Sequence, residues 1–267
     1  MTTPGALINR ALRPLGLKLQ RVSQRPYAAQ HEAAVRELIG IFTQHIAPDL
    51  PDALGRADLM LAFEGTGLTE GLYIAAALHR TRHLPGDVCE FGVAGGACSA
   101  FIANEIHASD KRLWLFDSFE GLPAPGPKDV LLHDIHNRGS MAAYQGDMAY
   151  PQARVQARLA AVNFPPARTR IVPGFIEQTI VQADLPALVS FAYIDFDFYE
   201  PILTALRWLA GHMPPGGVVI VDDYGFFSAG AQAAVDEFVA AQGGRFALEL
   251  PPKWAGAFAV LTVGEGG

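Results

Sequence analysis

Four aspartates stand at the ends of two apolar runs. Asp195 and Asp197 follow "FAYI" in "FAYIDFDFYEP", and Asp222 and Asp223 follow "VVIV" in "VVIVDDYG". Carboxylates that converge beside a buried sheet repel one another, and a bound cation relieves that repulsion. Oxygen ligands alone suit Mg²⁺, Mn²⁺ or Ca²⁺ and suit zinc poorly. If the two runs are neighbouring strands, Asp195, Asp222 and Asp223 are candidate ligands of a divalent metal, although each alone would be an ordinary cap or turn residue.

Asp197 is a candidate general base. It lies two residues after Asp195, so both side chains leave the same face if the strand continues through them. One carboxylate would then hold a metal while the other accepts a proton from a hydroxyl. Two adjacent hydroxyls chelate such an ion best, which favours sugars, cyclitols and catechols as substrates. The alternative is that Asp197 only caps the helix predicted in "YEPILTAL".

A glycine-rich turn follows the first apolar run, in "EFGVAGGACSAF". It lacks the second glycine of the dinucleotide pattern GxGxxG, which lets a pyrophosphate approach. Glu90, Gly92 and Gly96 instead fit a looser ExGxxxG arrangement, suited to a nucleoside without a pyrophosphate, such as S-adenosylmethionine. The alternative is a tight turn that packing alone requires.

Two further strand ends carry candidate cofactor contacts. Asp117, in "FDSFEGLP", lies 27 residues after Glu90, where a doubly wound fold presents an acid to ribose hydroxyls. Gly174 and Phe175, in "VPGFIEQT", are candidates to frame an adenine by stacking. A helix cap or a plain turn would explain either stretch as well.

A parallel sheet is needed to bring these strand ends together. Short, nearly continuous apolar runs alternate with helical stretches, as expected for parallel strands that helices cover on both faces. The runs are 87–93, 112–117, 169–172, 188–195 and 216–223. We therefore predict an α/β fold, a doubly wound sheet in strand order 3-2-1-4-5, with a C-terminal antiparallel hairpin at 245–250 and 257–263.

The chain divides into three parts. Residues 1–26 form a basic arm without acidic residues, interpreted as an arm or a subunit contact, or alternatively as an amphipathic membrane-surface helix. Residues 27–84 form a helical cap with helices predicted over 27–46, 52–63 and 69–82. Residues 85–267 form the cofactor-binding catalytic domain.

The stretch 124–150 is too long for an ordinary connection and is predicted to be a lid over the cleft. Within it, His133 and His136 are alternative bases, or simply solvated side chains. Trp254 either lines the far wall of the site or packs.

Composition excludes several classes of protein. With 267 residues and 50% hydrophobic content the chain buries a large core, and its net charge of -7 argues against nucleic acid as a partner. No apolar run reaches the roughly 18 residues of a membrane span, so we expect a cytoplasmic protein without a transmembrane segment. Cys89 and Cys98 are predicted to be buried free thiols.

The motifs together resemble the macrocin-type O-methyltransferases, which methylate sugar hydroxyls of macrolides and related natural products. The resemblance covers roughly residues 55–262 and rests on "FEGTGLTEGLY", "GDVCEFGVAGGACSAF", "LWLFDSFEGLP", "IDFDFYEPILTAL" and "PPGGVVIVDDYGFFSAGAQAAVDEF". It implies a class I S-adenosylmethionine-dependent fold and a homo-oligomer. It also implies a Mg²⁺ site at Asp195, Asp222 and Asp223, a base at Asp197, and cofactor contacts from Thr66, Tyr73, Ser118 and Phe119.

Two other functions remain open at this point. Three carboxylates also serve metal-dependent phosphoryl transfer or hydrolysis, although no phosphate-cradling GxxxxGK[ST] loop is present and Asp117 would have no role. A non-catalytic partner subunit would keep the fold alone. Binding of the cofactor and loss of turnover in an Asp197→Asn variant separate these possibilities.

Overall fold

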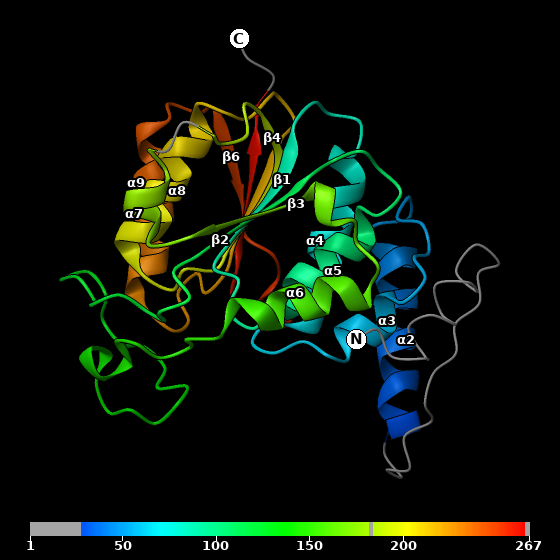
Figure 1. Ribbon diagram of the computed structural model, residues 1–267, viewed down its shortest axis with the longest axis horizontal. Helices are drawn as coiled ribbons and strands as arrows, with labels where there is room; N and C mark the ends of the chain where they lie inside the picture. Colours follow the sequence, from blue (N-terminus) through cyan, green and yellow to red (C-terminus); the bar gives the residue numbers. More distant parts are fainter. Residues whose placement is uncertain (1–27, 182–183, 265–267) are drawn as a thin grey trace.

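A computed structural model describes residues 28–181 and 184–264. Their centre is a seven-stranded sheet in the order β3-β2-β1-β4-β5-β7-β6 (Figure 1). The strands are β1 Asp87–Phe91, β2 Leu113–Asp117, β3 Thr169–Pro173, β4 Val189–Ile194, β5 Val218–Val221, β6 Phe246–Glu249 and β7 Ala259–Val263. The first five pair in parallel, and β7 pairs antiparallel with both β5 and β6. The predicted strand order and the terminal hairpin are confirmed.

The central strands are apolar throughout because both faces of the sheet are covered. Every residue of β4 and β5 is buried. Successive side chains alternate between two cores, as the pleat requires: Val88 and Phe191 join one, and Cys89 and Ala192 join the other. Continuous apolar runs therefore gave the correct strand assignments.

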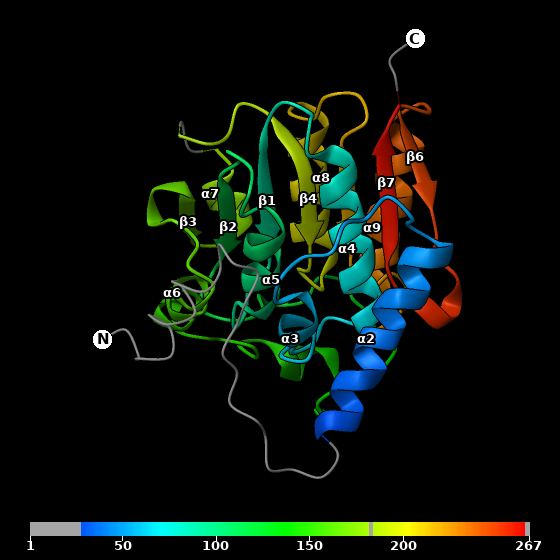
Figure 2. The ribbon, with the colours of Figure 1, turned by 90° about the vertical axis from the view of Figure 1, so that its right-hand side faces the viewer.

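Helices form a layer on each face of the sheet (Figures 1 and 2). One layer contains α2 Ala28–His45, α3 Arg56–Met60, α4 Leu68–Thr81, α5 Ala97–Glu105 and α6 Gln152–Ala161. The other contains α7 Ile176–Thr179, α8 Tyr199–Ala210 and α9 Ala229–Ala241. Short 3-10 helices occur at Met141–Tyr144, Pro166–Arg168 and Lys253–Ala255.

The helical N-terminal part packs directly on the sheet domain. The helices predicted over 27–46 and 69–82 correspond to α2 and α4, but the one predicted over 52–63 is wrong in extent. Only Arg56–Met60 is helical, because Gly55 precedes it in a left-handed conformation with φ 86°. Arg56 forms an ion pair of 2.7 Å with Glu105 of α5, and both side chains are buried. The predicted basic arm, 1–26, lies outside the described residues.

The stretch 124–150 is folded against the carboxyl end of the sheet. Leu131 forms a β-bridge with Ser228, just before α9. A small apolar cluster joins this part of the chain to the loops after β4 and β5; it comprises Leu122, Met141, Tyr144, Phe198 and Phe227. The stretch is therefore held by an apolar cluster that it shares with these loops.

Two smaller expectations can be checked in the described part of the chain. Cys89 and Cys98 are free and buried, as predicted, and burial raises the pKa of both thiols. No described helix has both the length and the apolar character that crossing a membrane requires.

Candidate active site

A pocket opens at the carboxyl ends of β1, β2, β3 and β4. The strand order reverses between β1 and β4, and doubly wound folds bind their ligands beside such a switch. Sixteen residues line the pocket: Gly92, Ala94, Asp117, Ser118, Gly121, Leu122, Pro123, Met148, Gly174, Phe175, Ile176, Glu177, Asp195, Phe196, Asp197 and Pro201.

Two glycines of the turn after β1, Gly92 and Gly96, are required for different reasons. Gly92 has φ 86°, and a Cβ there would lie 1.9 Å from the carbonyl oxygen of Asp195, so only glycine lets these two chain segments meet at the pocket. Gly96 does not line the pocket. A Cβ at Gly96 would instead lie 3.0 Å from the Cα of Val155 in α6, so packing of a helix explains this glycine.

Asp117 lines the pocket and also closes the glycine-rich turn. Its Oδ2 accepts hydrogen bonds from the amides of Val93 and Ala94 at 2.8 and 2.9 Å, and its Oδ1 accepts one from Phe119 at 2.6 Å. A carboxylate has about four acceptor positions, so little capacity is left for a ligand in this arrangement. Ser118 lines the pocket beside it, whereas the Phe119 side chain packs against the core.

Glu90 lies in β1 and is fully buried without lining the pocket. Neither of its carboxylate oxygens has a well-formed hydrogen bond within the described parts of the chain. Burial raises its pKa to about 8, an effect that the neighbouring Ser99 hydroxyl partly offsets. A buried carboxyl group without a firm partner is rare in proteins and is a candidate for a functional role.

Three carboxylates form a compact group at the ends of β4 and β5. Ligand oxygens of Asp195, Asp197 and Asp223 all lie within 4.8 Å of one another. Asp197 and Asp223 have positive φ angles of 65° and 58°, a strained conformation that is concentrated at functional sites. Burial first, and then repulsion by neighbouring carboxylates, raises the pKa of all three well above the ordinary range. This group can hold a hard cation or a proton.

Asp222 lies beside this group and is hydrogen-bonded to Tyr193, whose hydroxyl also lies next to Glu70. Its Oδ2 accepts a hydrogen bond of 3.0 Å from the Tyr193 hydroxyl, and its Oδ1 accepts one from the amide of Asp223 at 2.7 Å. The Tyr193 oxygen is also 3.2 Å from Oε1 of Glu70 in α4. Burial, and then the charges of Asp222 and Asp195, raises the pKa of Glu70 well above its usual value.

Glu70 was not predicted as a site residue. Its side chain also accepts a hydrogen bond from the amide of Gly67, which closes the first turn of α4. The only sequence signal was its place in "FEGTGLTEGLY", because the sequence alone does not reveal that α4 reaches the turns 195–197 and 222–223, here called the acidic turns.

The remaining predicted residues are dispersed. Gly174 and Phe175 line the pocket, whereas Thr66 and Tyr73 do not. Tyr73 packs edge-on against Phe42 and Phe258, with ring centroids 5.3 and 5.2 Å apart. It lines a separate pocket between α2, α4 and the β6–β7 hairpin.

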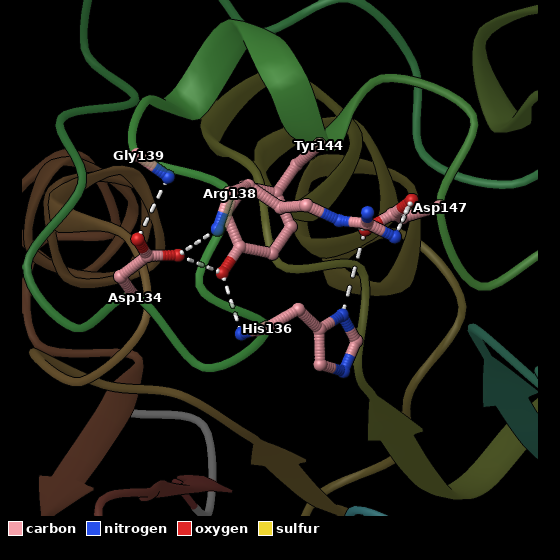
Figure 3. Close-up of polar contacts among 6 residues, drawn as sticks. All are labelled: Asp134, His136, Arg138, Gly139, Tyr144 and Asp147. Atoms are coloured by element: carbon pink, nitrogen blue, oxygen red, sulfur yellow. Dashed lines mark hydrogen bonds and ion pairs between the residues drawn. The ribbon is translucent and has the colours of Figure 1, made fainter.

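Neither candidate histidine lines the pocket at the carboxyl ends. His133 lies against the ring of Phe226, with centroids 4.9 Å apart. His136 is 3.5 Å from the Asp147 carboxylate and stacks on Tyr144 (Figure 3). Trp254 is mostly exposed and is also absent from the pocket.

A polar network within the stretch 124–150 orders its tip (Figure 3). Asp134 accepts hydrogen bonds from the Tyr144 hydroxyl at 2.6 Å and from the amides of Arg138 and Gly139 at 2.7 and 2.8 Å. Arg138 in turn forms two hydrogen bonds with Asp147. Apart from that of the buried Tyr144, these bonds join mostly exposed groups and contribute little energy singly, but together they define one conformation.

Comparison with known proteins gives the family of this chain. The family described as "Macrocin-O-methyltransferase (TylF)" matches residues 65–249, more than half of the chain. A 4'-O-methyltransferase from Streptomyces olivaceus that acts on 8-demethyl-8-(2,3-dimethoxy-alpha-L-rhamnosyl)-tetracenomycin C is 32% identical over 144 residues, which are 53% of this chain and 54% of the relative. Mycinamicin III 3''-O-methyltransferase from Micromonospora griseorubida is 30% identical over 146 residues, 53% of this chain and 56% of the relative. The matches thus span about half the length of these relatives.

Solved structures share the fold. The O-methyltransferase NovP superposes with a TM-score of 0.65 at 20% identity, covering 88% of this chain and 100% of that one. The calicheamicin methyltransferase CalS11 superposes with a TM-score of 0.59 at 22% identity, covering 92% and 98%. The fold is therefore that of class I S-adenosylmethionine-dependent methyltransferases, as the resemblance implied. With the family match over residues 65–249, the chain belongs to the macrocin O-methyltransferase family.

Proposed function

We propose that this protein transfers a methyl group from S-adenosylmethionine to a hydroxyl group of a sugar in a glycosylated natural product. The observation that carries the proposal is the group of Asp195, Asp197 and Asp223, of which the first two line the pocket beside the strand-order switch. The names of the relatives, which describe methylation of a rhamnosyl tetracenomycin and of mycinamicin III, support the substrate class.

The cofactor is proposed to lie along the carboxyl ends of β1, β2 and β3. Gly92, Asp117, Ser118, Gly174 and Phe175 line that side of the pocket. A ribose hydroxyl would donate to Asp117, displacing an amide of the glycine-rich turn, and the Phe175 ring would stack on the adenine.

The donor set at the acidic turns fits a magnesium ion. All the donors are carboxylate oxygens of half-buried side chains, and burial, followed by repulsion between neighbouring carboxylates, raises the pKa of Asp195 and Asp223. We propose that Asp195, Asp222 and Asp223 hold the ion. When bound, Mg²⁺ neutralises these charges and lowers the pKa of an acceptor hydroxyl.

The protein's own residues would then align the acceptor and take its proton. Methyl transfer is an in-line displacement: the acceptor C–O bond forms as the methyl–sulfur bond breaks, and S-adenosylhomocysteine leaves. Asp197 lines the pocket within the acidic group and would accept the hydroxyl proton. The apolar side chains of Leu122, Met148 and Phe196 would exclude water from this step.

Calorimetric titration tests the proposal. S-adenosylhomocysteine is titrated into the protein with Mg²⁺ and again with a chelator, and we expect micromolar binding in both. A panel of vicinal-diol glycosides then serves as acceptors. No binding of S-adenosylhomocysteine in either condition would refute the methyltransferase function and favour metal-dependent hydrolysis by the same carboxylates.

The proposed base is tested with an Asp197→Asn variant. It should bind S-adenosylhomocysteine as the wild type does and lose at least about 100-fold in turnover. Asp52→Asn, at an exposed position outside the pocket, is the matched control and should retain full turnover. Near-normal turnover of Asp197→Asn would reject Asp197 as the base.

A further inference from the structure

Asp129 is a buried carboxylate that no feature of the sequence singled out. It lies in the stretch 124–150, yet only 6% of its surface is exposed. Its Oδ1 accepts a hydrogen bond of 2.8 Å from the amide of Tyr199, the first residue of α8. Its Oδ2 accepts one of 2.7 Å from the amide of Gly126 in its own segment. Asp129 therefore caps a helix from a distant part of the chain.

The same carboxylate lies against the first turn of a second helix. A Cβ on Gly230 of α9 would lie 1.9 Å from Oδ1 of Asp129 and 2.9 Å from the amide nitrogen of Tyr199. Only glycine allows the two helix starts to approach the carboxylate this closely. The Ser228 hydroxyl, which caps α9, is 3.4 Å from the same oxygen. Helix N-termini carry partial positive charge, so both helix starts stabilise the carboxylate.

Each of these two helices directly follows one of the acidic turns. α8 begins two residues after Asp197, and α9 begins six residues after Asp223. Both aspartates have strained, left-handed backbone conformations, which persist only where the surrounding structure holds them. The distance between the Asp197 and Asp223 side chains therefore depends on the contacts that join the starts of α8 and α9.

A second contact from the same segment reinforces this joint. Tyr144 is fully buried in a cluster with Phe198, the residue after Asp197, and with Phe227, which precedes the cap of α9. The Tyr144 and Phe227 ring centroids are 4.8 Å apart, and those of Phe198 and Phe227 are 6.2 Å apart. The backbone amide of Ala229 also donates to the carbonyl of Val130, at 2.9 Å.

We propose that Asp129 is a positioning residue that joins the starts of α8 and α9 and thereby fixes Asp223, a proposed ligand of the metal ion, at the separation from Asp197, the proposed base, that the metal-dependent centre needs. The segment around it is then part of the catalytic scaffold. This inference rests on the proposed function, because it assigns the two aspartates to one metal-dependent centre.

The test measures binding of Mn²⁺ alone to the full chain, by calorimetry and by the free-Mn²⁺ electron paramagnetic resonance signal. Asp129→Ala removes both hydrogen bonds and the charge, whereas Asp129→Asn keeps an acceptor oxygen for Tyr199. We expect Asp129→Ala to weaken Mn²⁺ binding at least tenfold, and Asp129→Asn to weaken it only about threefold, because the amide keeps one acceptor but loses the charge and the acceptor for the amide of Gly126. Affinity for S-adenosylhomocysteine, whose proposed contacts lie on β1, β2 and β3, should change less than twofold.

A control separates positioning from simple loss of stability. Phe42→Leu alters a buried side chain in α2, remote from the acidic turns, and lowers stability by itself. It should leave the Mn²⁺ affinity unchanged. Unchanged Mn²⁺ affinity in folded Asp129→Ala or Asp129→Asn, with only the melting temperature lowered, would assign Asp129 to the fold alone and overturn the inference.

The Mn²⁺ titration of the wild type distinguishes a failure of this inference from a failure of the proposed function. No Mn²⁺ binding by the wild type would overturn the metal-dependent function and the inference with it. If Asp129→Ala fails to fold, Asp129→Asn decides the question, since it preserves the side-chain volume and one acceptor.

Discussion

Replacing Glu90 by glutamine should make the protein more stable at alkaline pH. The Glu90 carboxyl is fully buried in β1, and burial raises its pKa from 4.5 to about 8. Because this pKa is higher in the folded than in the unfolded state, the folded protein binds more protons between these values. The free energy of unfolding of the metal-free protein therefore falls as pH rises from about 4.5 to about 8.

The pKa difference sets the size of the effect. Each pH unit between the two values costs up to about 1.4 kcal/mol, so the full difference corresponds to about 5 kcal/mol. A buried glutamine amide also lacks a firm partner here, which costs about 1–3 kcal/mol at every pH. We expect Glu90→Gln to be slightly less stable than the wild type near pH 5, and about 2–4 kcal/mol more stable near pH 8.

Urea unfolding, followed by circular dichroism at pH 5, 6.5 and 8 in a chelator, measures this effect. The informative quantity is the difference in unfolding free energy between variant and wild type, since the contribution of every titratable group that does not interact with Glu90 cancels in it. Glu120→Gln, at an exposed position, is the matched control and should show no pH trend. A constant difference across this pH range would refute the reasoning and show that Glu90 is charged at neutral pH in the folded protein.

Three further substitutions test the packing around the site. Gly92→Ala should cost at least about 3 kcal/mol and abolish S-adenosylhomocysteine binding, because its Cβ would overlap the Asp195 carbonyl; a normal melting temperature would contradict this. Tyr193→Phe removes the proton that two buried carboxylates share and should cost about 1–3 kcal/mol in urea unfolding; a cost below about 0.5 kcal/mol would mean that the hydroxyl is dispensable. Arg56→Ala leaves Glu105 buried without its partner and should lower the free energy of unfolding by about 3–5 kcal/mol. The double variant Arg56→Met, Glu105→Leu should restore most of this loss. Equal stability of the single and double variants would exclude desolvation of Glu105 as the cause.

The order of the sheet and the place of the site could be predicted from local patterns. Continuous apolar runs define the parallel strands, since both faces of the sheet are covered, and the doubly wound arrangement expected for such strands supplies their order. That order alone brings Asp195 and Asp223 to neighbouring strand ends and Asp117 to the other side of the switch. The helix predicted over 52–63 was too long because the left-handed conformation of Gly55 delays the start of α3.

The partner of each polar side chain could not be predicted in the same way. The spacing of Asp117 suggested a ribose contact, which stays a prediction, but it did not reveal that Asp117 also accepts backbone amides of the glycine-rich turn. Gly96 fitted a cofactor motif, yet the space it leaves is filled by Val155 of α6.

No local pattern revealed the contacts of Glu70 and Asp129, because the groups that give them their roles lie more than 60 residues away in the chain. A sequence pattern sets the local conformation and the buried face of each element. The pattern does not determine which helix start, hydroxyl or carboxylate each charged side chain will contact. Those contacts form only when α4, α8, α9 and the stretch 124–150 pack against the same edge of the sheet.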